Sequence, residues 1–450
     1  MSFVMPRVEF VATAIMAGAL LLTGCGERRD ADEPDPANTD AAEPVVARQP
    51  DITHLRQPPA DPRATLEAAL SSGVLVYEGD DNAFLAEVLK VCGIPAASQV
   101  LVFSKTSLQS PLISPSNPRA IYFSDDCYVG FVPGGLIEIS DTDAEGGTGF
   151  YSLHPQTYDP AEPLDTPVSC LNCHSSSRTH YAPGLLVRSV FPDAEGFPIG
   201  SAGSHITGHA SPLEERWGGW YVTGQHGAMR HMGNAIAREL ANDAELDMEA
   251  GANLTALDGL LAPDRYLAPG SDIVALMVLE HQVEMHNLLT QGAIAVRRQT
   301  FRSGRIAESS GEVFDPYESE TLMSLVNHSA ERIVEHMLFT DELALTDPVR
   351  GDRAFIRQFR ANRHETDDGR SLKDLDLTTR LFRYRCSYMV YSQAFEQMPA
   401  LLKDAVYRQL FDALAGMETG LNAHLDADER TAIVEILRAT KDDLPAYWAD

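Results

Sequence analysis

The residues best placed to do chemistry are Cys170, Cys173 and His174, which form the pattern C-x-x-C-H. This spacing is typical of c-type haem attachment: each thiol forms a thioether with a haem vinyl group, and the imidazole that follows binds iron. We predict one covalent haem c, with His174 as an iron ligand. A zinc site is the alternative for paired cysteines, but it needs two more closely spaced ligands. The other cysteines stand alone in the sequence, which favours haem.

A glycine-rich stretch further along the chain offers candidates for the sixth iron position. Imidazole and thioether groups are ligands that haem iron accepts, and glycine lets the backbone approach a flat ligand closely. We rank His231 first and His226 second, followed by Met232 and Met229. Each of these histidines taken alone is more often a hydrogen-bonded loop residue. Their density close to the C-x-x-C-H segment is what favours a role at the haem.

The charge balance restricts the possible partners. The 450 residues include 65 acidic and 35 basic side chains, a formal net charge of −30. Such a surface repels nucleic acid and does not hold an anionic substrate by general attraction. It suits a solvated protein or one that meets a basic docking face, so we expect no nucleic-acid partner and an unidentified redox partner protein.

The first residues read as an export signal. Residues 1–24 contain an apolar run from Phe10 to Leu22 that is too short for a membrane span and typical of a signal peptide. The run ends just before Cys25 in a pattern that resembles the bacterial lipobox, which implies a mature chain starting at a lipidated Cys25; cleavage without lipidation is the alternative. Gly26, where Asp would favour the inner membrane, implies the outer membrane of a Gram-negative bacterium. We expect a protein on the periplasmic side whose only membrane contact is the lipid anchor.

Three regions follow a tether. Residues 25–63 are rich in proline and acidic residues without apolar periodicity, which predicts disorder. Residues 64–155 contain short apolar runs separated by turn signals, which predicts a β-rich region with antiparallel pairing. The elements expected there are helices at Thr65–Leu70 and Phe84–Val91 and strands at Val100–Phe103, Ile121–Phe123, Tyr128–Val132, Leu136–Ile139 and Phe150–Leu153.

The haem-binding region spans residues 156–235 and precedes a helical region, 236–450. A hairpin is expected from Leu185–Phe191 and Phe197–Ile199, and a helix at Ile273–Val296 carries His281 on its apolar face. His281 is there either a core histidine or an outside candidate for the iron. Further helices are expected at Glu318–Phe339, Pro348–Arg363, Thr378–Gln397, Leu401–Leu414 and Ala427–Ala439. The fold class is therefore α+β, with 64–450 as one compact body.

The remaining cysteines suggest no second cofactor. Cys92, Cys127 and Cys386 are left once the haem motif and Cys25 are assigned. Buried inert thiols are the default, and a Cys92–Cys127 disulfide stays open because sequence cannot show it.

Beyond these motifs, the chain resembles an uncharacterised family of exported bacterial cytochrome c domain-containing proteins. The resemblance covers most of the chain after the tether, and it implies haem attachment but no activity. It rests on the tracts Leu101–Ser107, Ser114–Arg119, Cys170–His174 with Ser176–Thr179, Glu215–Gly224, His226–Gly227, Arg230–Asn234, Leu279–Gln282 and Met285–Leu288.

Two functions fit these observations. One haem, an exported acidic body and a membrane tether suit electron transfer, as a carrier or as a subunit of an oxidoreductase. A haem enzyme of peroxidase or oxygenase type is the alternative, because a simple carrier needs only about a hundred residues. The groups available for peroxide chemistry are Arg178, His180, Trp217, Trp220, His226, Arg230 and His231. We expect six-coordinate iron and electron transfer.

Overall fold

The computed structural model describes residues 55, 60–143, 147–240, 243–417 and 420–449. The expected signal peptide and Cys25 lie outside these residues, as does most of the expected tether. Asp51–Asp450 form one compact unit. None of the helices in the described residues has the length and apolar character needed to cross a membrane.

A six-stranded antiparallel sheet forms the N-terminal half. Its order is β5-β4-β3-β2-β1-β8, so the first five strands follow the chain as a meander. The strands are β1 (Val100–Val102), β2 (Arg119–Phe123), β3 (Cys127–Phe131), β4 (Ile137–Asp143), β5 (Gly147–Leu153) and β8 (Trp220–Tyr221). β8 returns from far along the chain and pairs with β1, with Leu101 opposite Tyr221.

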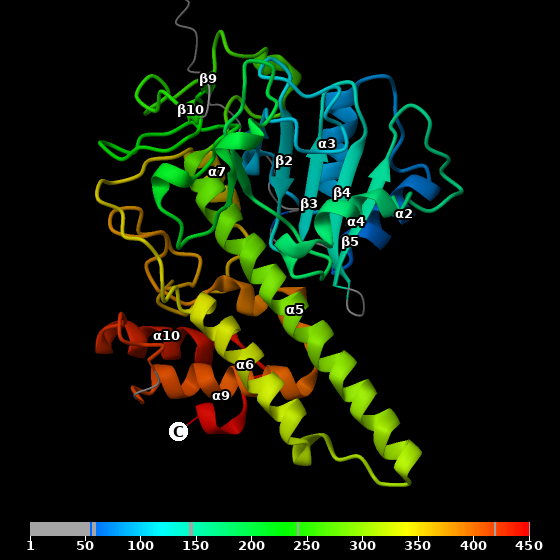
Figure 1. Ribbon diagram of the computed structural model, residues 1–450, viewed down its shortest axis with the longest axis vertical. Coiled ribbons are helices and arrows are strands. Elements are labelled where there is room, and N and C mark those ends of the chain that lie inside the picture. The colour runs from blue at the N-terminus through cyan, green and yellow to red at the C-terminus, as the bar shows by residue number, and fades with distance from the viewer. Residues whose placement is uncertain (1–54, 56–59, 144–146, 241–242, 418–419, 450) are drawn as a thin grey trace, which may run out of the picture. The chain divides into compact units, whose positions relative to one another are not determined.

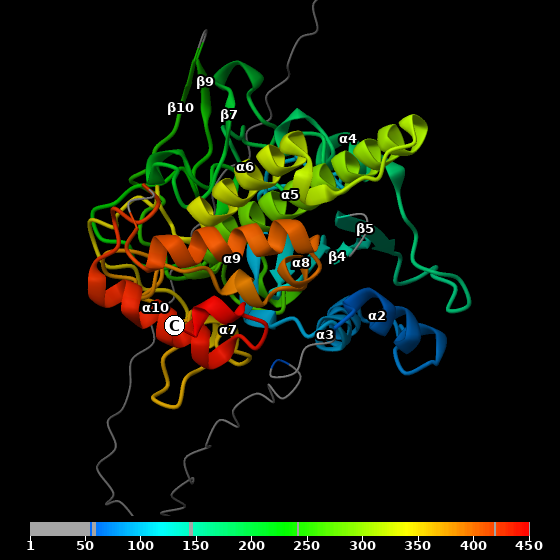
Figure 2. The ribbon, with the colours of Figure 1, turned by 90° about the horizontal axis from the view of Figure 1, so that it is seen from below.

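Helices cover both faces of this sheet because the strands are apolar on both sides (Figure 2). One face carries Tyr122, Val129 and Ile139 and packs against α2 (Pro62–Ser71) and α3 (Asp81–Val91). The opposite face contributes residues such as Val102 to the larger core built on α5. The sheet is therefore a middle layer, and side chains that alternate along one strand reach two different cores.

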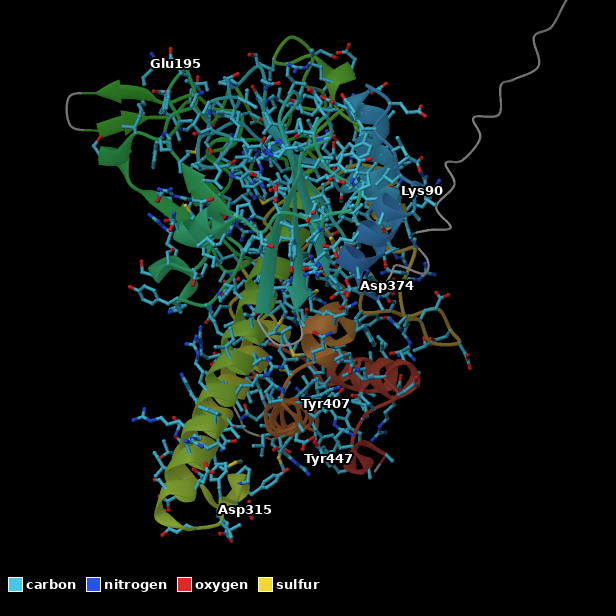
Figure 3. The ribbon with its side chains drawn as sticks, turned by 90° about the vertical axis from the view of Figure 1, so that its right-hand side faces the viewer. Lys90, Glu195, Asp315, Asp374, Tyr407 and Tyr447 are labelled. Carbon is cyan, nitrogen blue, oxygen red and sulfur yellow. The ribbon has the colours of Figure 1, made fainter. Side chains whose placement is uncertain are left out.

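The longest element is α5 (Ile273–Ser310), which runs from the sheet into the C-terminal half (Figure 1). Asp272 caps its first turn by accepting hydrogen bonds from the amides of Val274 and Ala275. It ends at Gly311, whose φ of 73° is the left-handed conformation that glycine adopts freely at a helix end. Asp315 marks the turn beyond it (Figure 3).

The C-terminal half is mostly helical and packs around α5. α6 (Glu320–Met337) returns along α5 and contacts α9 (Ala400–Leu414). The other elements are α7 (Arg353–Phe359), α8 (Gln393–Glu396) and α10 (Ala427–Thr440). An antiparallel sheet in one half and helices in the other make this an α+β fold, which confirms the predicted class.

Three expectations about elements are wrong. Residues 236–272 hold no α-helix in their described part: β9 (Arg238–Leu240) and β10 (Asp243–Glu245) form a hairpin there, and one 3-10 turn lies at Pro263–Arg265. β6 (Arg188–Val190) pairs with β7 (Ser204–Ile206), while the expected hairpin with 197–199 forms only at its tip, by a Pro192–Pro198 bridge and two backbone hydrogen bonds.

The third error is the helix expected at Thr378–Gln397. The Asp376 carboxylate accepts hydrogen bonds from the amides of Thr378 and Thr379, and Leu377 has a φ of 58°. These local bonds offer the backbone an alternative to the helix, as short acidic side chains often do. Only α8 and a 3-10 turn at Tyr388–Tyr391 form in the second half of that range.

Candidate functional site

The C-x-x-C-H residues share one helical turn. A 3-10 turn at Val168–Cys170 leads directly into α4 (Leu171–His174). Cys170 is half-buried and Cys173 exposed, and both thiols are free. Residues three apart in a helix lie on one face, so the two sulfur atoms are presented side by side. Burial and the nearby Glu138 carboxylate raise the pKa of the Cys170 thiol.

The His174 imidazole has a defined tautomer. Its Nδ1 lies 2.8 Å from the carbonyl oxygen of Gly184. Because a carbonyl oxygen can only accept, Nδ1 carries the hydrogen and Nε2 keeps its lone pair. Burial lowers the pKa of His174, so the ring is neutral at pH 7. A neutral imidazole oriented through Nδ1 is the form that binds a metal through Nε2.

Two neighbours hold this ring and its carbonyl partner in place. The Phe150 ring of β5 lies over His174, with centroids 4.5 Å apart. On the other side, Asn287 of α5 accepts a hydrogen bond from the Leu185 amide and donates one to the Leu185 carbonyl, both at 2.9 Å. A Cβ on Gly184 would lie 2.5 Å from the Asn287 Oδ1 atom, so only glycine permits this approach. The C-x-x-C-H segment is thus held both by the sheet and by α5.

An ion pair lies on the sheet face below this segment. Arg119 of β2 pairs with Glu138 of β4, and both side chains are largely buried. The strand between them places Gly130 opposite Glu138, where a Cβ would lie 2.4 Å from the Arg119 guanidinium. The absent side chain of Gly130 therefore makes room for the guanidinium to reach across β3.

The predicted sixth-ligand candidates lie in the segment after β8. His226 has both ring nitrogens engaged: Nδ1 donates to the Met229 carbonyl at 2.8 Å, and Nε2 accepts from the Asn253 amide at 3.0 Å. Binding iron through either nitrogen would require breaking one of these bonds. His226 has the geometry of a satisfied loop histidine.

His231 is different, because neither ring nitrogen has a hydrogen-bond partner among the described residues. The side chain is buried, with its ring centroid 5.3 Å from Trp217 and 4.7 Å from His226. Burial lowers the pKa of His231 to about 3. The adjacent Met232 sulfur accepts a hydrogen bond from the Ser189 hydroxyl, which occupies one side of that thioether.

The structure thus forms two separate groups from the predicted site residues. Cys170, Cys173 and His174 come together in one turn, while His226 and His231 come together beside Trp217, with Met229 packed against the neighbouring core. In the described ranges, no hydrogen bond or ring contact joins the second group to the C-x-x-C-H segment. That one of its members binds haem iron stays a prediction.

A third group was not predicted as a unit. His281 of α5 lies against His209 and His336, and one ring nitrogen of each lies within 4.8 Å of the others. The apolar pattern predicted that His281 lies on the inner face of its helix, but nothing in the sequence predicted a contact with His336. These residues are 72 and 55 positions from His281, and no spacing signal spans such gaps.

Comparisons of the chain with family models, with curated proteins and with solved structures gave no match.

Proposed function

We propose that this chain is an exported, lipid-anchored c-type haem protein that transfers electrons on the periplasmic side of the outer membrane of a Gram-negative bacterium. The observation that carries the proposal is the pairing of two free thiols in one turn with an imidazole whose Nε2 is left free by the Gly184 bond. This donor set fits a covalent haem, which would supply a one-electron redox couple when attached.

The surface around the motif also suits a flat apolar group. Val168, Leu171 and Tyr181 are 77%, 39% and 71% exposed, although large apolar side chains are usually covered. Cys170 and Cys173 would hold the haem here, and Gly184 would hold His174 in the orientation that binds iron. Burial and then the nearby Arg178 lower the pKa of Arg188, and the two guanidinium groups give this edge a basic character within an acidic protein.

A haem enzyme of peroxidase or oxygenase type is the second candidate. It is favoured by His231, whose two ring nitrogens have no partner among the described residues. A neutral imidazole with no structural hydrogen bond presents ring nitrogens that can form a hydrogen bond to a bound oxidant, although its low pKa makes it a weak base.

The first test is covalent haem attachment. The chain, produced in cells with haem-attachment machinery, should give a haem-stained band on a denaturing gel. Replacing both motif cysteines, Cys170→Ala with Cys173→Ala, should abolish the band, while Cys386→Ala should keep it. An unstained wild-type band would refute the proposal and favour a metal site at the two thiols.

The second arm separates the two functions. Carbon monoxide added to the ferrous protein and peroxide added to the ferric protein should react slowly or not at all if two protein ligands hold the iron. Fast carbon monoxide binding, with peroxide turnover that falls in His231→Ala, would decide for the enzyme.

A further inference from the structure

We propose that His209, His281 and His336 form a second metal site, which binds a divalent first-row transition ion, Zn²⁺ or Cu²⁺. The site is independent of haem attachment. It lies where the loop before Trp217, helix α5 and helix α6 meet.

The distances within the cluster fit one ion. The Nδ1 atoms of His209 and His281 are 3.0 Å apart, and one ring nitrogen from each histidine lies within 4.8 Å of the other two. Two imidazole nitrogens bound to one tetrahedral zinc at about 2.0–2.1 Å are separated by roughly 3.3 Å. The three rings lie within 20° of parallel, so they must turn out of this stack for their in-plane lone pairs to point at one ion.

Hydrogen bonds outside the cluster engage one ring nitrogen of two of the three histidines. His336 donates through Nε2 to the His281 carbonyl at 3.1 Å, so its Nδ1 is an acceptor. His281 Nε2 lies 2.7 Å from the Ser387 hydroxyl, and its Nδ1 is an acceptor for an ion in the tautomer in which Nε2 donates to that oxygen. The remaining ligand, His209, has its backbone carbonyl fixed by Arg216 at 2.8 Å. Metal-binding histidines are commonly oriented by such outer bonds.

The backbone next to the cluster is strained in a way that supports a site. Phe339 has a φ of 56° and is fully buried, although bulky residues rarely adopt the left-handed conformation. Its ring stacks on His281 and His209, with centroids 4.2 and 4.9 Å away. Backbone strain of this kind is concentrated at functional positions. Here it places an apolar wall against two of the three imidazoles.

The ligand chemistry selects the ion. Three imidazoles without a carboxylate suit zinc and copper rather than calcium or magnesium, which prefer oxygen ligands. Of the two acids adjacent in sequence, Glu280 is engaged with Arg216 at 3.1 Å and Glu335 is exposed. Three protein ligands leave a fourth position for water or a substrate, which is the arrangement of reactive rather than structural zinc sites.

The experiment uses the full chain with Cys170→Ala and Cys173→Ala, so that haem iron does not contribute, and a purification tag without histidine. The protein is stripped with EDTA, reloaded with Zn²⁺ or Co²⁺, passed through a desalting column and measured by elemental analysis and visible absorption. We expect about one ion per chain and a cobalt spectrum typical of tetrahedral nitrogen ligands.

Two variants and one control define the site. His336→Gln should lower metal affinity by at least tenfold, and Ser387→Ala, which frees His281 to rotate, should lower it about 10–100-fold. His286→Gln, a buried histidine on the same helix but outside the cluster, should leave the affinity unchanged. If His336→Gln does not fold, a zinc-dependent rise in the melting temperature of the stripped parent protein tests the same claim. A stripped parent that neither takes up an ion nor gains stability would overturn the proposal, as would equal loss in His286→Gln.

Discussion

Asn287 is the residue through which α5 supports the haem motif, and its replacement tests that connection. Its side chain makes two hydrogen bonds of 2.9 Å to the Leu185 backbone and is 5% exposed. Leaving a buried backbone group without its partner costs about 1–3 kcal/mol. Because Leu185 is only half-buried, we expect the lower part of that range for each bond, and Asn287→Ala should lower the free energy of unfolding by about 2–4 kcal/mol.

The same change should also reach the imidazole. Leu185 follows Gly184, whose carbonyl holds His174 Nδ1, so a loosened loop weakens the orientation of the proposed iron ligand. The assay is urea unfolding together with the reduced absorption spectrum and midpoint potential of the haem-loaded chain. Asn287→Ala should change all three measurements.

A matched control separates positioning from stability. Asn422, in the loop between α9 and α10, also makes two side-chain hydrogen bonds to the backbone, donating to the Ala413 carbonyl at 2.6 Å and to the Met417 carbonyl at 3.0 Å. Asn422→Ala should lower stability to a similar degree without changing the spectrum or potential. The reasoning is refuted if both variants alter the haem alike, or if Asn287→Ala loses less than about 0.5 kcal/mol.

Two further predictions concern α5. Burial lowers the pKa of His286 to about 4, below the roughly 6.5 of an unfolded chain, so the unfolded state binds more protons between these values and stability falls as pH drops through this window. Measured by urea unfolding, the free energy of unfolding of the wild type should fall by about 2 kcal/mol more than that of His286→Gln between pH 8 and pH 5. A difference in stability between the two proteins that does not change with pH would contradict this. Asp272 accepts hydrogen bonds from two amides of α5 and from the Asp352 amide, so Asp272→Ala should lower the free energy of unfolding by about 2 kcal/mol. The matched change Asp352→Ala removes the single capping hydrogen bond of the short α7 and should lower the free energy of unfolding by about 1 kcal/mol in the same assay. Equal losses in the two variants would show that the additional hydrogen bonds of Asp272 contribute nothing to stability.

Secondary-structure elements with a clear local sequence pattern could be predicted. Alternation in β3 places Val129 on one face and Tyr128 on the other, and turn residues separate the strands, so the antiparallel meander could be read from the sequence. The helix expected at Ile273–Val296 continues to Ser310. The sequence pattern did not predict this extension, because the residues after Val296 are largely exposed and show no apolar stripe. Their helix follows from the terminal cap at Gly311 and from packing against α6.

The candidate site also has a part that the sequence predicts and a part that it does not. The C-x-x-C-H residues are contiguous, so their pattern can be recognised from the sequence alone. Gly184, Asn287 and the His336 contact are not, because each depends on a contact between segments that only the folded chain brings together. The satisfied state of His226 depends on the Asn253 amide, 27 positions later.

The bond between Asn287 and Leu185 has a consequence for the order of assembly. It joins residues 102 positions apart, and the later one belongs to a helix made after the thiols. At a synthesis rate of about 5–20 residues per second, the C-x-x-C-H segment precedes its anchor by roughly 5–20 s. During that interval Cys170, Cys173 and His174 lack their support from α5. Docking of α5 then orients His174 through Leu185 and Gly184 while Cys173 stays exposed, so the imidazole takes its final position after the thiols have been made.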